Sequence, residues 1–150
     1  RAVSSKHDTE MISYKLQYPK LLFKREQRDY ANDTFKIEDT QFLINTANPF
    51  NILGVAGFII MLRPKKVIIQ WWHPYFAPCY LILASLIKSK ILFICHNVFP
   101  HERFPLDRFL TKLTLKCGDY FILHSKKEVE ASIVDCWNFF SDSFFLCNII

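Results

Sequence analysis

Glycine is scarce in this chain, with only three among the 150 residues: Gly54, Gly57 and Gly118. Dinucleotide-binding loops and Walker-type loops hold phosphate groups against the backbone, and they need several closely spaced glycines after a strand. No stretch of the sequence meets that requirement. The sequence therefore argues against a nucleotide-phosphate site within these residues.

The cysteine patterns of metal centres and disulfide frameworks are also missing. The five cysteines are odd in number and include no Cys-x-x-Cys pair, which favours reduced thiols in a cytosolic protein. The residues available for a metal site are not spaced like the helical His-Glu-x-x-His zinc motif. Those residues are His73, His96, His101, Glu102 and His124. We expect no metal ion.

Hydrophobic runs long enough to cross a bilayer are absent. The longest runs, residues 52–62 and 75–87, fall short of the ~18 to 20 apolar residues of a transmembrane helix. Residues 1–10 are polar, so they indicate a frayed lead rather than a secretory signal. We therefore expect a cytoplasmic location.

The composition indicates one folded domain with a large core. Hydrophobic residues make up 51% of the chain and charged residues 22%, and fifteen residues are Phe, which argues against disorder. The net charge of +5 permits contact with nucleic acid, anionic lipid or phosphorylated ligands. No nucleic-acid-binding motif accompanies the charge, so we expect no nucleic-acid partner.

Three apolar runs, each followed directly by a histidine, organise the chain. Residues 67–72, 91–95 and 120–123 are typical of interior strands of a parallel sheet. The carboxyl ends of parallel strands share one edge, where the ligands of open α/β sheets bind. The pattern therefore predicts a polar edge formed by His73, His96 and His124.

Helices are predicted between the strands. Asn48 followed by Pro49 starts a helix that should end near Leu62 and, being apolar on nearly all sides, should be well buried. A second helix is expected from about residue 76 or 78 to residue 89. With an alternating strand at residues 12–18, these elements predict an α/β fold, a three-layer Rossmann-like domain with a mainly parallel sheet.

A third helix is expected over residues 105–116, with Gly118 as its C′ residue. Arg108, Lys112 and Lys116 lie four residues apart along it and form either a solvated face or a patch for an anionic membrane. The apolar spacing predicts a separate core face of Leu106, Phe109, Leu110 and Leu113.

The residues at the strand ends suit a hydroxylated ligand. His96 beside Asn97 can donate or accept a hydrogen bond and titrates near neutrality, although a role in tying two loops together is equally open. Trp71 and Trp72 alternate across the sheet, so at most one faces a ligand and the other belongs to the core.

A last helix is predicted to begin at Ser125, which forms a capping box with Glu128. The N–H groups and dipole of its first turn would face the same edge, where an anion could bind. Residues 129–150 are expected to form a divergent helical or Phe-rich tail without a clear period.

Four strings of the sequence resemble the N-terminal half of bacterial GT-B glycosyltransferases, most closely the retaining, family-4-like enzymes. The resemblance covers about residues 11–128. Its most specific string is His96-Asn97-Val98-Phe99-Pro100-His101-Glu102. The others are residues 17–23, Gln70-Trp71-Trp72-His73-Pro74 with Phe76-Ala77-Pro78, and Asp107-Arg108 through Gly118-Asp119 to His124-Ser125-Lys126-Lys127-Glu128.

The resemblance implies a domain that holds the acceptor and faces a second domain, which binds the nucleotide sugar without a metal or other cofactor. The implied reaction moves a hexose to a glycan or lipid-linked acceptor in polysaccharide or cell-envelope synthesis, often on the cytosolic membrane surface. His96 would lie at the reacting sugar as the catalytic residue. The implied substrate contacts are Trp71, Trp72, His73, Asn97, His101, Glu102, His124, Ser125 and Glu128.

The chain departs from the family pattern in three places. The first strand with its glycine-containing loop is missing before Met11, the nucleotide-sugar domain is missing, and the match ends near Val129. Because transfer needs donor and acceptor held together, we expect the chain alone to be inactive. The alternative function is a non-catalytic α/β module that binds a membrane surface or a protein partner through its basic helix and Phe-rich tail.

Overall fold

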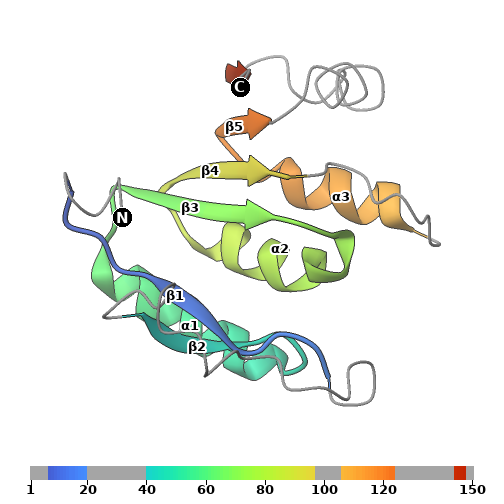
Figure 1. Ribbon diagram of the computed structural model, residues 1–150. Coiled ribbons are helices and arrows are strands. Elements are labelled where there is room, and N and C mark those ends of the chain that lie inside the picture. Colours follow the sequence, from blue (N-terminus) through green and yellow to red (C-terminus); the bar gives the residue numbers. More distant parts are fainter. Residues whose placement is uncertain (1–6, 20–39, 97–105, 124–143, 148–150) are drawn as a thin grey trace, which may run out of the picture. The chain divides into compact units, whose positions relative to one another are not determined.

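The computed structural model describes residues 7–19, 40–96, 106–123 and 144–147, the last of these by its backbone (Figure 1). The chain divides into two compact units, Arg1–Val55 and Ala56–Ile150. Helices and strands alternate along the described residues, and each pair of described strands is parallel. The predicted α/β class with parallel strands in open sheets is therefore confirmed.

The first unit contains a two-stranded parallel sheet of β1 (Ile12–Leu16) and β2 (Gln41–Asn45). Hydrogen bonds hold both ends of the pair: the Gln41 N–H donates to the Met11 carbonyl at 2.8 Å, and the Thr46 hydroxyl donates to the Gln17 carbonyl at 2.6 Å. The strand predicted at residues 12–18 from alternating side chains is confirmed as β1, whereas β2 was not predicted. Both the expected extension at residues 21–23 and the short extended piece at residues 35–39 lie outside the described residues.

Helix α1 spans Pro49–Leu62, with the bounds that its cap predicts. The Asn48 side-chain oxygen accepts hydrogen bonds from the Phe50 and Asn51 N–H groups at 3.0 and 3.2 Å, which satisfies two of the unpaired donors of the first turn. Arg63 follows the helix in a left-handed conformation, with φ of 49°, and Pro64 prevents its continuation.

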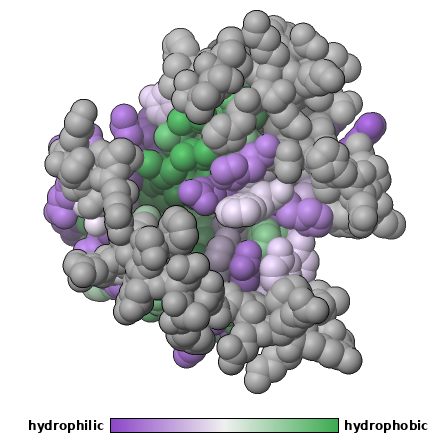
Figure 2. Space-filling view, viewed as in Figure 1, coloured by the Kyte–Doolittle hydropathy of each residue, from purple (hydrophilic) through white to green (hydrophobic). Residues whose placement is uncertain are grey.

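The expectation that α1, being apolar on nearly all sides, is well buried is wrong for most of its surface. Its buried residues lie on one face, whereas Phe50 is 81% exposed and Met61 is 71% exposed. An apolar composition shows that a helix can be buried, but burial also requires a neighbouring element on each side. Hydrophobic residues, green in Figure 2, reach the molecular surface beside hydrophilic ones on the face shown there. The buried face comprises Ile52, Val55, Ala56 and Ile59.

The second unit contains a four-stranded parallel sheet in the order β3-β4-β5-β6. Three of its strands, β3 (Lys66–Trp71), β4 (Lys90–Cys95) and β5 (Tyr120–Leu123), are those predicted from the apolar runs. The fourth, β6 (Phe144–Cys147), lies in the tail that was expected to be helical or Phe-rich. A four-residue strand has too few residues to show a period, so pairing with β5 decides its conformation.

The core of the second unit lies on one face of this sheet. Side chains alternate along each strand, so that Trp71, Phe93 and Phe121 all point to the buried face. The η2 turn (Pro74–Phe76) leads from β3 into helix α2 (Ala77–Leu86), which covers this face. The Trp71 ring lies 6.2 Å from the Tyr80 ring on α2 and 6.5 Å from the Phe93 ring on β4. The aromatic residues thus join the first two strands to the helix between them.

Helix α3 (Asp107–Leu115) turns its polar face, not its apolar face, to the core. The predicted core face is wrong because Leu106, Phe109 and Leu113 are 69%, 60% and 38% exposed. The buried side of the helix is largely polar instead. The Thr114 hydroxyl donates to the Ala77 carbonyl of α2 at 3.3 Å and to the Leu110 carbonyl at 2.9 Å. Short hydroxyl side chains let the two helices approach closely. The residues on this side are Asp107, Thr111, Thr114 and Leu115.

Asp119 fastens the amino ends of β4 and β5 together. Its carboxylate accepts hydrogen bonds from the Ile91 N–H at 2.8 Å and from Lys90 Nζ at 2.6 Å, and its own N–H donates to the Ile91 carbonyl at 2.9 Å. Burial alone would raise the pKa of Asp119, but the hydrogen bonds from Lys90 and Ile91 and the charge of Lys90 outweigh burial. The pKa of Asp119 therefore lies below its ordinary value.

We predict that Asp119→Asn lowers the stability of the chain at neutral pH and matters less in acid. An unfolded Asp titrates near pH ~3.9, so the stabilising contribution of a carboxyl with a lowered pKa is complete above that pH. It is lost as the pH falls through the pKa of the folded state. Urea unfolding of both proteins should show the gap between their midpoints at about pH 7 shrinking towards about pH 3. A gap that is constant with pH would contradict the role of the charge.

Candidate functional site

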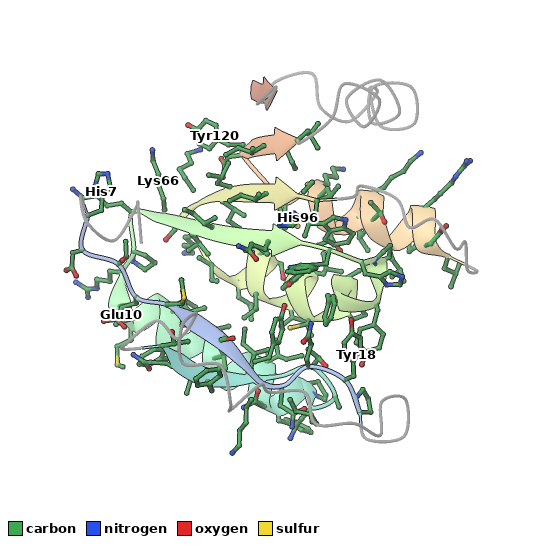
Figure 3. All side chains as sticks on the ribbon, viewed as in Figure 1. His7, Glu10, Tyr18, Lys66, His96 and Tyr120 are labelled. Carbon is green, nitrogen blue, oxygen red and sulfur yellow. The ribbon has the colours of Figure 1, made fainter. Side chains whose placement is uncertain are left out.

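The carboxyl ends of the three predicted strands are level with one another. Trp71, Cys95 and Leu123 are paired across β3, β4 and β5, and each is the last residue of its strand. The predicted common edge therefore exists, and the first residues beyond it on β3 and β4 are Trp72 and His96. Figure 3 shows His96 at the carboxyl end of β4.

Trp72 and His96 form an exposed aromatic pair at this edge. Because Trp71 is paired with Cys95, the next residue on each strand points to the same, opposite face of the sheet. The two rings have centroids 5.1 Å apart and planes inclined by 41°. The His96 N–H donates to the Trp71 carbonyl at 3.1 Å, which continues the ladder by one bond. The backbone thus holds the imidazole against the indole.

The two tryptophans have different environments, as the alternation of a strand predicts. Trp71 has no exposed surface, whereas Trp72 is 52% exposed. Trp71 is therefore a core residue that supports the edge from beneath. Of the two, Trp72 is the residue that a ligand can reach.

His73 shapes the chain after β3. Its Nδ1 accepts a hydrogen bond from the Tyr75 N–H at 3.1 Å, so it caps the η2 turn, and Pro74 begins the turn. An accepting Nδ1 carries no proton, which assigns the proton of a neutral ring to Nε2. The sequence predicts that His73 lies beside the edge. In the structure it is the second residue after β3 and caps the η2 turn.

One polar residue at this site was not singled out from the sequence. Gln70 is an exposed residue of β3, and Trp72 follows directly after the strand, two residues later. Both side chains therefore lie on the same face of the sheet. Its side-chain amide can both donate and accept hydrogen bonds. The signal in the sequence is a single polar residue within the otherwise apolar run of residues 67–72.

Six of the predicted site residues lie outside the described residues. They are Asn97, His101, Glu102, His124, Ser125 and Glu128. Among the predicted residues, the structure thus brings together Trp72 and His96, with Trp71 beneath them and His73 next along the chain. Arg108, Lys112 and Lys116 lie on α3 and at its end, where Arg108 and Lys116 are exposed and Lys112 is half-buried.

The described thiols are poor candidates for nucleophiles. Cys79, Cys95 and Cys117 are free cysteines, and burial raises the pKa of Cys79 to about 12. Burial also raises the pKa of Cys117, against a smaller opposing effect of Lys116. Since the thiolate is the reactive form, Cys79 and Cys117 have their reactivity lowered by their surroundings.

Neither a cluster of metal-binding side chains nor a membrane-spanning helix occurs in the part of the chain that the structure describes. Within residues 7–19, 40–96, 106–123 and 144–147, no three His, Cys, Asp or Glu side chains gather into a group that could hold a metal ion. Within the same residues, no helix combines the length and the apolar character that crossing a membrane requires. The exposed groups described at the site are the indole of Trp72, the imidazole of His96 and the amide of Gln70.

Comparisons with known proteins identify no relative of this chain. No family model matches it, and no curated protein and no solved structure gives a match. What can be said of its function therefore depends on its own residues and geometry.

Proposed function

We propose that this chain is the acceptor-side part of a retaining GT-B glycosyltransferase, which moves a sugar from a nucleotide donor to a glycan or lipid-linked acceptor. The observation that carries the proposal is the exposed pair of Trp72 and His96 at the carboxyl edge of a parallel sheet. This is the edge at which open α/β sheets bind ligands. The glycosyltransferase-like string begins at the same residue, His96.

The chemistry of the pair suits a sugar. An indole face presents a flat apolar surface with a polar edge, which matches the C–H face of a sugar ring. The imidazole of His96 can donate a hydrogen bond to a hydroxyl or accept one from it. The Gln70 amide on the same face of β3 adds a second group of that kind. In this proposal, Trp72 supplies the contact area and His96 lies at the reacting sugar.

The proposal assigns the nucleotide to a second domain outside these 150 residues. The scarcity of glycine argues against a phosphate loop here, and transfer requires both substrates in one cleft. The same proposal includes a finer description of the fold, in which the chain is a three-layer Rossmann-like domain and forms one half of a GT-B enzyme. It also places the enzyme at the cytosolic surface of the membrane. The parallel sheet of the second unit is compatible with it.

The first test is the mass of the native gene product, read by immunoblot with an antibody against residues 91–128. We expect at least roughly twice the 17.8 kDa of this chain, because two domains are required. A product found only at the mass of this chain would overturn the enzymatic proposal. It would leave the non-catalytic binding module as the function to test.

The second test measures sugar transfer by the native-length product, supplied with radiolabelled UDP- and GDP-hexoses and a membrane extract as acceptor. We expect His96→Ala to lower the rate about a hundredfold, as the loss of one hydrogen-bond donor at a reacting centre does, without a change in thermal unfolding. His7→Ala is the matched control, because His7 is an exposed histidine that precedes β1. Equal rates for the two variants would contradict the role of His96.

A further inference from the structure

Helix α3 presents a hydrophobic ridge to its surroundings. We use the name apolar ridge for Leu106, Phe109 and Leu113. Phe109 and Leu113 lie four residues apart on one side of α3, and Leu106 is the N-cap residue, three residues before Phe109. All three are exposed, and Leu106 and Phe109 retain more than half of their surface. Leu106 has a left-handed backbone with φ of 70°, which is uncommon for a residue other than glycine.

A row of positive charge flanks this ridge. Arg108, Lys112 and Lys116, here called the basic row, are spaced by four residues. Lys112 comes three residues after Phe109, and Lys116 comes three after Leu113, so the row lies beside the ridge on the helix surface. Figure 3 shows long side chains that end in nitrogen extending outward from α3. The two rows together give the helix an apolar strip with cationic groups along it.

Helix α3 itself brings no exposed carboxylate to these two rows. The one carboxylate of α3 belongs to Asp107, which is 4% exposed on the buried side, where it accepts a hydrogen bond from the Arg108 N–H. The exposed sides of α3 therefore attract anions without a competing carboxylate of the helix. The arrangement is complementary to an apolar layer covered by negative groups.

Packing within the unit does not explain why the apolar side faces outward. The side that α3 turns to α2 is largely polar, and the Thr111 hydroxyl on it is fully buried without a hydrogen-bond partner in the described structure. Burial of the leucines and Phe109 would instead have removed apolar surface from water. A surface that binds the ridge would compensate for its exposure.

We infer that α3 docks on an anionic lipid bilayer, with the apolar ridge among the outer acyl carbons and the basic row at the lipid phosphates. A helix with one apolar and one basic face lies in the plane of the membrane interface in this way, and lysine and arginine are attracted to anionic lipid headgroups. Nucleic acid would bind the basic row but would leave the apolar ridge in water. The inference depends on α3 alone and stands whether or not the chain belongs to a sugar transferase.

The test is co-sedimentation of the full chain with vesicles of phosphatidylcholine alone and of phosphatidylcholine with one quarter phosphatidylglycerol, at physiological salt. We expect binding to the anionic vesicles and little binding to the neutral ones. Reversal of the basic row by Arg108→Glu, Lys112→Glu and Lys116→Glu should reduce the bound fraction at least tenfold. Replacement of the ridge by Leu106→Ser, Phe109→Ser and Leu113→Ser should do the same.

Matched controls separate a specific surface from general charge and general stickiness. Arg63→Glu, Lys65→Glu and Lys66→Glu make the same change in charge at three exposed residues outside α3, and Met61→Ser removes an exposed apolar side chain from α1. Both controls should bind anionic vesicles as the original chain does. All variants are checked for unchanged thermal unfolding.

Three results would overturn the inference. The first is an original chain that does not sediment with anionic vesicles. The second is an equal loss of binding in the α3 variants and the matched controls, because this would show that any basic or apolar surface residue serves. The third is binding of a single-stranded RNA oligonucleotide that depends on the basic row, together with vesicle binding that does not.

Discussion

Replacement of Trp71 by alanine is expected to lower the free energy of unfolding by about 3–5 kcal/mol, the usual cost of truncating a buried aromatic side chain. Domains of this kind have a total stability of about 5–15 kcal/mol, so the loss is a large fraction of the total. Trp71 has no exposed surface and contacts Tyr80 of α2 and Phe93 of β4. Its removal leaves a cavity where two strands and a helix meet.

The neighbouring tryptophan provides the control. Trp72 is 52% exposed on the opposite face of the sheet, so Trp72→Ala should cost less than about 1 kcal/mol. Urea unfolding followed by circular dichroism measures both variants, because tryptophan fluorescence changes with the substitutions themselves. Similar losses for the two variants would contradict the assigned faces, since a shift of one residue in strand register exchanges buried and exposed residues.

The parallel strands of the second unit could be predicted because their signal is local. Continuous apolar runs of four to six residues, separated by segments long enough for helices, are sufficient to indicate β3, β4 and β5. The alignment of their carboxyl ends at one edge then follows from parallel topology, with His96 directly after β4. The contact between Trp72 and His96 needs one more fact, the pairing of Trp71 with Cys95, and nothing local in the sequence specifies that register.

The face of α3 shows what periodicity leaves open. The spacing of Leu106, Phe109 and Leu113 correctly places them on one side of the helix, but spacing does not say which side meets the core. In this unit, close packing of Thr114 against the Ala77 carbonyl decides the orientation. That contact joins residues far apart in the sequence, so the local spacing of apolar residues does not indicate it.

Short strands at sheet edges were missed for a related reason. β2 and β6 have five and four residues, and a strand of that length is stabilised mainly by its partner rather than by its own pattern. β2 forms by pairing with β1, and β6 forms by pairing with β5. Prediction of such strands needs the pairing, which is known only when the fold is known.

Gly118→Ala is expected to destabilise the chain by about 1–3 kcal/mol, the cost of inserting a methyl group into a well-packed core. The sequence predicted Gly118 as the C′ residue of α3, but the C-cap is Lys116, two residues earlier, and no described glycine has the positive φ that favours glycine at a helix end. The glycine serves close packing instead. A Cβ atom at Gly118 would lie 2.5 Å from Phe93 Cδ2 and 2.8 Å from Phe121 Cζ.

Neither phenylalanine has room to move away. Both are buried, and their rings are stacked with centroids 5.9 Å apart. The same substitution at Gly57 is the matched control, because a Cβ atom there would meet nothing within 4 Å in the middle of α1. Alanine is favoured over glycine inside a helix by about 0.5–1 kcal/mol, so Gly57→Ala should stabilise the chain. Urea unfolding should therefore shift in opposite directions for the two variants, and a shift in the same direction would show that space at Gly118 is not what requires a glycine.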